Sequence, residues 1–175
     1  MLGLPAEARR RVLGTVLHMK TTIRLVVAVL VIVSSVAAPE AQFGLWSAAE
    51  LSKRDAALST KVGADHSSRE TLADYGHHRF RLLYRDADGL PEQHDTIVDV
   101  VMVQSGEGTL QLGGEMIGRR AGSGAGEFLG TRLEGGTRHP LGAGDVVHIP
   151  AGIPHSFLVP KGKHITYVLV KFPKD

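Results

Sequence analysis

The most constraining feature of the chain is the stretch 144–155, which places one histidine between two strands. A glycine and an aspartate open it with a turn signal, and an apolar segment follows at 146–149. Pro150 and Gly152 signal a second turn, and His155 begins the next apolar run. Two turns and two strands hold one imidazole rigidly. Such a mount suits a metal ligand or a proton-transferring histidine, although a histidine that only begins a strand is the simpler interpretation.

Apolar residues with a period of two dominate the chain from about residue 78 onward. Phe80, Leu82 and Tyr84 share one strand face, and a β-branched run at 98–104 predicts a strand covered on both faces. Turn signals rather than helical patterns separate the segments, so we expect an antiparallel barrel or jelly roll. The remaining strands are predicted at 109–112, 131–134, 139–141, 146–149, 156–159 and 165–172.

Glycine-rich segments predict the connections between these strands. Residues 105–108 are expected to turn the chain into the strand 109–112, which belongs to a hairpin closed by Gly113 and Gly114. Residues 118–127, rich in glycine, serine and alanine, predict a loop.

Composition excludes several kinds of site. The 175 residues include no cysteine, which excludes disulfides and thiolate metal sites and leaves His, Asp and Glu as metal ligands. The net charge is only +2 and aromatic residues make up 5%, so nothing favours nucleic-acid binding. The length predicts one domain.

Residues 1–37 are predicted to be a signal peptide. A short basic region at 19–24 precedes an apolar run at 25–33, and small residues follow. Met19 is a second possible start. The apolar run is shorter than the roughly 20 residues of a membrane-spanning helix, which makes an uncleaved anchor the weaker alternative. Cleavage after Ala37 predicts a secreted or periplasmic protein without a stable membrane anchor.

Residues 38–77 are predicted to form an N-terminal arm ahead of a domain at 78–175. Ser47, followed three residues later by a glutamate, forms a capping box that predicts a helix over about 47–61. A similar pattern predicts a second short helix from Ser67.

The chain resembles the cupin superfamily, in particular small bacterial single-domain cupins with a signal peptide. The second cupin motif is Gly, five residues, Pro, one residue, Gly, two residues, His. Gly144, Pro150, Gly152 and His155 match every position. The asparagine that often follows in the family is replaced by Val159.

The first cupin motif, which has two histidines, a glutamate and a glycine, is only partly kept. Gly106 holds its last position, Asp99 stands at the carboxylate, His94 is the second histidine and Glu92 replaces the first. The resemblance covers about residues 78–172. It implies an all-β fold, a cupin-type jelly-roll β-barrel with a short helical N-terminal arm, in which these groups converge on a metal.

One divalent transition metal, Mn, Fe, Ni, Cu or Zn, is the predicted cofactor, because two imidazoles and one or two carboxylates suit these ions. Asp99 leads an apolar strand face, where a carboxylate is costly unless it is paired or metal-bound. His148 is expected to line the pocket or to be a partly exposed strand residue. The predicted ligands are His94, Asp99, His155 and Glu92.

Three functions follow from these residues and the resemblance. The first is a metal-dependent enzyme, an oxygenase, isomerase or lyase, acting on a small organic molecule. The second is a non-catalytic cupin that binds a small molecule or sugar. The third is a structural protein with a vestigial site, favoured by the incomplete first motif. A small-molecule ligand or substrate is the expected partner, and the resemblance adds a homodimer; no catalytic residue is identified.

Overall fold

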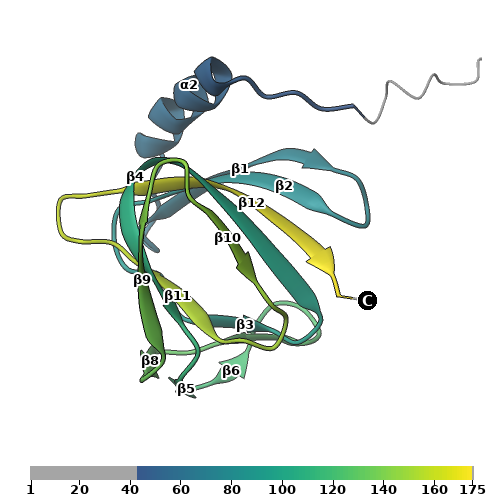
Figure 1. Ribbon diagram of the computed structural model, residues 1–175, viewed down its shortest axis with the longest axis vertical. Coiled ribbons are helices and arrows are strands. Elements are labelled where there is room, and N and C mark those ends of the chain that lie inside the picture. Colours follow the sequence, from purple (N-terminus) through teal and green to yellow (C-terminus); the bar gives the residue numbers. More distant parts are fainter. Residues whose placement is uncertain (1–42, 175) are drawn as a thin grey trace, which may run out of the picture. The chain divides into compact units, whose positions relative to one another are not determined.

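The computed structural model describes residues 43–174, so the predicted signal peptide lies outside the described residues. The unit Gly44–Asp175 contains the helix and strands shown in Figure 1. No helix in the described part of the chain is both long and apolar enough to cross a membrane.

Helix α2 (Ala48–Ser59) begins where the capping pattern predicts it. The hydroxyl of Ser47 accepts a hydrogen bond from the backbone N–H of Glu50, which satisfies one of the free donors of the first turn. Leu51 and Leu58 are the buried residues of the helix. Asp55 also joins the helix to the strands, because its two carboxylate oxygens accept hydrogen bonds from the hydroxyls of residues 105 and 166.

Short strands make up most of the rest of the described chain. Their bounds are β1 (Ser67–Asp74), β2 (Arg79–Arg85), β3 (Glu92–His94), β4 (Ile97–Leu112), β5 (Glu115–Ile117), β6 (Arg120–Ala121), β7 (Glu127–Leu129), β8 (Arg132–Glu134), β9 (Thr137–Gly142), β10 (Val146–Ile149), β11 (His155–Leu158) and β12 (Ile165–Pro173).

Strand β4 organises the antiparallel sheet. The main path runs β1-β2-β12-β4-β11-β3-β7-β6, and β9 and β10 also pair with β4. The first part of β4 pairs with β12 and β10, and its last part pairs with β11 and β9. One long strand therefore passes from one half of the sheet into the other, and the sheet curls around an interior (Figure 1). The predicted cupin-type jelly-roll barrel with a short helix is confirmed.

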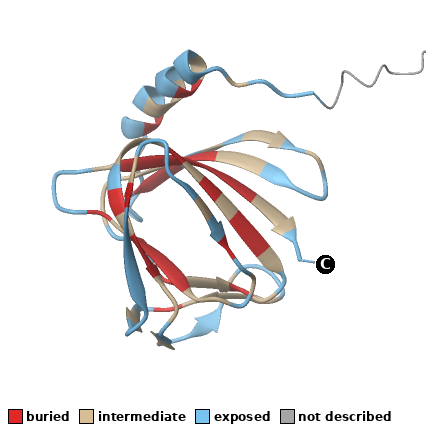
Figure 2. Cartoon of the chain, in the orientation of Figure 1, coloured by how far each residue is buried: buried red, intermediate tan, exposed pale blue. Residues whose placement is uncertain are grey.

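The two faces of the sheet bury two separate clusters. Inside the barrel, Val101, Leu110, Phe157 and Tyr167 belong to the larger cluster. On the outer face, α2 packs against a second cluster that includes Val168. Strand β12 contributes to both, which explains why its sequence is almost continuously apolar. Figure 2 shows buried residues in several strands of the sheet and in α2.

The predicted turn at 105–108 is wrong, because β4 continues through it. Gly106 has a φ of +73°, and the pairing of β4 with β12 shifts register between Thr166 and Tyr167. The residue left without a partner at this shift is Gln104, and the glycine two residues later lets the strand bend without ending. The turn signal in the sequence marks a bend between the two halves of the sheet.

Two further expectations about local structure are wrong. The segment from Ser67 forms β1, which pairs with β2 along its length, and is not a helix. Its capping pattern carried no information about this pairing, and strand formation depends on such neighbours. The segment 118–127, expected to be a loop, contains β6 and the first residue of β7.

Candidate metal centre

Two imidazoles and two carboxylates converge in the barrel. One ligand atom from each lies within 4.8 Å of the others, a spacing at which four side chains could hold one metal ion. The sequence predicted all four as ligands, and the structure brings all four together; ligation itself stays a prediction. We call Glu92, His94, Asp99 and His155 the ligand cluster.

Strand pairing explains why the ligand cluster forms. Glu92 and His94 are two residues apart on β3, so their side chains point to the same face. Glu92 pairs directly with His155 of β11. Asp99 shares the inward face of β4 with Val101 and is 1% exposed. The four residues converge because β3, β4 and β11 each direct alternate side chains into the interior of the barrel.

The carboxylates lie between the two imidazoles. The Nε2 atom of His94 is 3.4 Å from Oε2 of Glu92 and 3.5 Å from Oδ2 of Asp99. The Nε2 atom of His155 is 3.5 Å from Oε1 of Glu92 and 3.6 Å from Oδ2 of Asp99. Both rings therefore direct the same nitrogen toward both carboxylates.

Hydrogen bonds on the far side of each ring fix this orientation. Nδ1 of His155 lies 3.0 Å from the carbonyl oxygen of Ile153, and Nδ1 of His94 lies 2.5 Å from Oε2 of Glu127. Metal-binding histidines commonly direct their second nitrogen to a carbonyl or carboxylate in this way. Among the described residues, Nε2 of His155 and Oδ1 of Asp99 are buried without a hydrogen-bond partner. Buried polar atoms rarely lack partners, so the donor set fits a bound cation.

Glu127 was not predicted from the sequence. It begins β7, pairs with His94 of β3, and lies in the segment 118–127 that was expected to be a loop. Its spacing from His94 is 33 residues, and no local pattern links the two. Only the pairing of β3 with β7 reveals it.

Lys171 was also missed, and it enters the cluster as a cation. Its Nζ lies 2.5 Å from Nε2 of His94, 3.2 Å from Oδ2 of Asp99 and 3.9 Å from Oε2 of Glu92. In the sequence it is a single charge in an apolar strand, two residues after the inward-facing Leu169. A single charged residue at an inward-facing position of an apolar strand is the sequence feature that could have identified Lys171.

The ionisation of the cluster reflects its close opposite charges. Burial opposes the charge of His94 and His155, but the nearby carboxylates of Asp99 and Glu92 outweigh it and raise the pKa values of these histidines to about 10 and about 9. Burial likewise opposes the charge of Asp99, yet the two imidazoles lower its pKa to about 2. The same partners hold the pKa of Glu92 well below its usual value. The site therefore favours two anionic carboxylates surrounded by positive charge.

His148 does not line the pocket. It is exposed on β10, while the adjacent Val147 packs against the core inside the barrel. Side chains alternate along a strand, so His148 points outward. The expectation that it lines the pocket is wrong. His148 lies in an apolar run, but only alternate residues of that run face the interior of the barrel.

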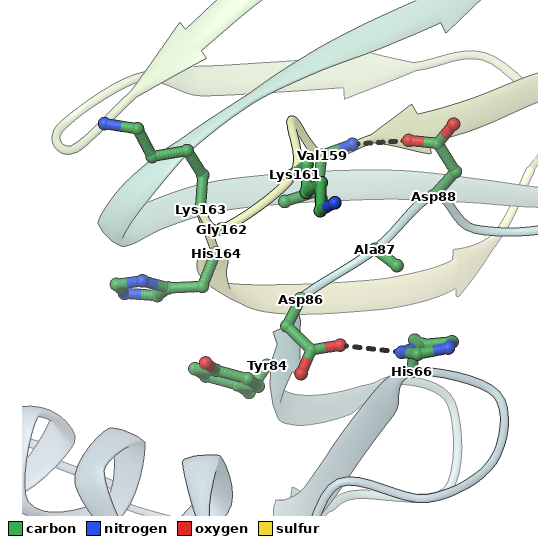
Figure 3. Close-up of a pocket in the computed structure, with 10 residues that line it drawn as sticks. All are labelled: His66, Tyr84, Asp86, Ala87, Asp88, Val159, Lys161, Gly162, Lys163 and His164. Atoms are coloured by element: carbon green, nitrogen blue, oxygen red, sulfur yellow. Dashed lines mark hydrogen bonds and ion pairs between the residues drawn. The ribbon is translucent and has the colours of Figure 1, made fainter.

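A cavity of about 720 Å³ lies away from the ligand cluster, between the end of β2 and the turn that precedes β12 (Figure 3). Its acidic groups already have partners. Asp86 pairs with His66 at 3.1 Å, and Asp88 accepts a hydrogen bond of 2.7 Å from the backbone N–H of Val159. No member of the cluster lines this cavity, so its size alone does not make it the functional site.

Comparisons with known proteins find likeness in structure only. No model of a known family matches the chain, and no curated protein sequence matches it significantly. A polyketide cyclase, RemF from Streptomyces resistomycificus, is 19% identical over 65% of this chain and 68% of its own, with a TM-score of 0.44. KdgF from Halomonas sp. is 18% identical over 63% and 82%, with a TM-score of 0.44. The cupin domain of Cnp3 from Schizosaccharomyces pombe is 7% identical over 62% and 66%, with a TM-score of 0.46. Because the sequence identities are below 25% and the TM-scores are below 0.5, these similarities carry no information about activity.

Proposed function

We propose that this chain, which folds as a cupin-type jelly-roll barrel, binds one divalent transition metal and is a metal-dependent enzyme acting on a small organic molecule. The observation that supports it best is that Nε2 of buried His155 has no hydrogen-bond partner within residues 43–174, while the hydrogen bond on its other nitrogen holds the ring toward Asp99. His94, Asp99, His155 and Glu92 would hold the ion. A metal there would act as a Lewis acid for an oxygen of the substrate in an oxygenase, isomerase or lyase.

Access to the cluster also favours an enzyme over a sealed structural site. The side chains of His94, Asp99 and His155 are at most 3% exposed, whereas that of Glu92 is 33% exposed. Buried donors with one open side resemble catalytic metal sites, which keep a position for substrate or water. A vestigial site would instead be filled by packed side chains.

The metal content of the purified protein tests this proposal. We expect about one transition-metal ion per chain by elemental analysis, identified from Mn, Fe, Ni, Cu or Zn. His155→Ala and Asp99→Ala should lose it, because each removes a buried ligand. His139→Ala is the matched control, since His139 is an exposed histidine of β9. Absence of stoichiometric metal from the wild-type chain after loading with each of the five ions would refute the proposal.

A metal-free binding protein is the second candidate, and Lys171 favours it. Its ammonium lies near both carboxylates and could balance their charge without a metal. A small molecule or sugar would then bind without turnover. Ligand binding that a chelator does not change, with no product after long incubation, would favour this function over the first.

We also propose that the protein is exported. The basic, apolar and small-residue segments within 19–37 support a cleaved signal peptide. Cell fractionation should place the protein in the periplasm or medium, with Ala38 at its mature N-terminus. Retention of the first 37 residues on a membrane-bound protein would contradict this.

A further inference from the structure

A second cavity, of about 220 Å³, is lined mainly by residues of β2 and β12 and of the turn that precedes β2. Lys171 connects this cavity to the ligand cluster, because it lines the cavity and its Nζ lies 3.2 Å from Oδ2 of Asp99. Arg79 and Arg81 of β2 line the same cavity. Three cationic side chains therefore face a space beside the proposed metal.

The pairing of β2, β12 and β4 places these cationic residues on the same face of the sheet as Asp99. Lys171 of β12 pairs with Asp99 of β4 on one side and with Arg79 of β2 on the other. Arg81 lies in the next row on the same face, opposite Leu169. Side chains in neighbouring rows are roughly 7–8 Å apart, within reach of one small molecule. The cavity and the cluster are thus parts of one face of the sheet.

Arg81 differs from the other cations in having no partner. Arg79 pairs with Asp74 at 2.6 Å, and Lys171 approaches Asp99 and Glu92. Within residues 43–174, Arg81 forms no ion pair and its guanidinium no hydrogen bond. Burial lowers the pKa of this guanidinium, and the charge of Arg79 lowers it further. A partly buried, unpaired guanidinium is costly, and a bound anion would remove that cost.

Apolar residues that line the cavity indicate which kind of ligand it could bind besides an anion. Ile97 and Leu169 line it and offer an aliphatic surface beside the cations. Its volume is below the roughly 300–1,000 Å³ of sites for drug-sized ligands. A short carbon chain with one anionic end fits both properties.

We propose that the substrate of the metal site is a small organic anion whose carboxylate or phosphate group binds Arg81 in this cavity. This inference rests on the proposed function and adds the class of substrate. A guanidinium donates two parallel hydrogen bonds to either oxyanion, which fixes the orientation of the molecule as well as its charge. The other end of the molecule then lies toward the ligand cluster, past Lys171.

Calorimetric titration of the full mature chain tests the inference. The probes are malonate, succinate and inorganic phosphate, with uncharged succinamide as the control ligand. Arg81→Gln should weaken binding of the preferred anion about 10- to 100-fold, as expected for charge-assisted hydrogen bonds. Arg81→Lys should lose part of the affinity, because it keeps the charge and loses the paired donors. Arg138→Gln is the matched control at an exposed arginine of β9 and should bind as the wild type.

The outcomes separate this inference from the proposed function. Binding of malonate or succinate that depends on Arg81 supports a carboxylate substrate, and Arg81-dependent phosphate binding supports a phosphate. Equal affinity of wild type and a folded Arg81→Gln, equal binding of succinamide, or no binding of any anion overturns the inference even if the chain holds its metal. Arg81-dependent binding in the chain that holds no metal supports the anion site while the metal proposal fails.

Discussion

The carboxylate of Glu127 lies 2.5 Å from Nδ1 of His94, although 33 residues separate them in the chain. The pair forms because β7 lies beside β3 and the two residues are direct partners in the register. Glu127 does not approach the centre of the cluster as a fifth ligand. It orients the ring that presents Nε2 to Asp99 and Glu92.

Glu127→Gln should reduce metal affinity by about 10- to 100-fold, because outer hydrogen-bond partners of metal-bound histidines have effects of this size. Titration with a competing chelator measures the affinity. Glu115→Gln, at an exposed glutamate of β5, is the control and should leave the affinity unchanged. Equal affinities for Glu127→Gln and wild type would show that the carboxylate does not support the ring.

Lys171→Met should increase metal affinity by roughly tenfold or more, because it removes a positive charge from the ligand cluster but keeps an apolar stem of similar length. Equilibrium dialysis against the metal found in the wild type gives the ratio. Lys163→Met, at an exposed lysine whose partner is Glu107, is the control. A lower affinity in Lys171→Met would mean that the ammonium supports metal binding rather than competing with it.

The metal-free protein should lose stability at both ends of the pH range. The pKa values of about 10 for His94 and about 9 for His155 lie above the usual 6.5, so their contribution is complete below about pH 6.5 and disappears as the pH rises through 9 to 10. The pKa of about 2 for Asp99 lies below the usual 3.8, so its contribution is present above pH 3.8 and disappears as the pH falls through 2.

Urea denaturation in the presence of a chelator, repeated from about pH 2 to about pH 10, measures this dependence. Asp99→Asn should flatten the decline between about pH 7 and pH 10, because it removes a partner that holds both imidazoles protonated. Metal should reverse the trend over the same interval, since it binds unprotonated imidazole. A wild-type midpoint that stays constant from pH 7 to pH 10 would contradict the raised pKa values.

Gly106→Ala should destabilise the fold by at least about 2 kcal/mol. Its φ is +73°, and a Cβ atom there would lie 2.0 Å from the carbonyl oxygen of His164. Gly142→Ala is the control, because a Cβ atom at that position has no neighbour within 4 Å. Chemical denaturation gives both free energies of unfolding. Equal stabilities of the two variants would show that the bend in β4 does not need a glycine.

The ligand cluster was predicted through the resemblance to the two cupin motifs, because the spacing of a motif is a local property of the sequence. The positions of His94, Asp99 and His155 follow from matching two segments to those motifs, residue by residue. Glu127 and Lys171 could not be found in this way, since their roles depend on which strands become neighbours. The bend at Gly106 was mistaken for a turn for the same reason: a glycine with positive φ allows either, and only the pairing of β4 with β12 decides between them.

The position of β12 in the sheet has a consequence for how the protein is made. This strand comes last in sequence order among the described elements, yet it lies between β2 and β4 and contributes side chains to both apolar clusters. A chain in which β12 has not yet been synthesised leaves β2 and β4 with unpaired edges, and it has no Lys171 beside the cluster. The part of the sheet that β2, β12 and β4 share therefore forms only after β12 has been synthesised, late in the described part of the chain.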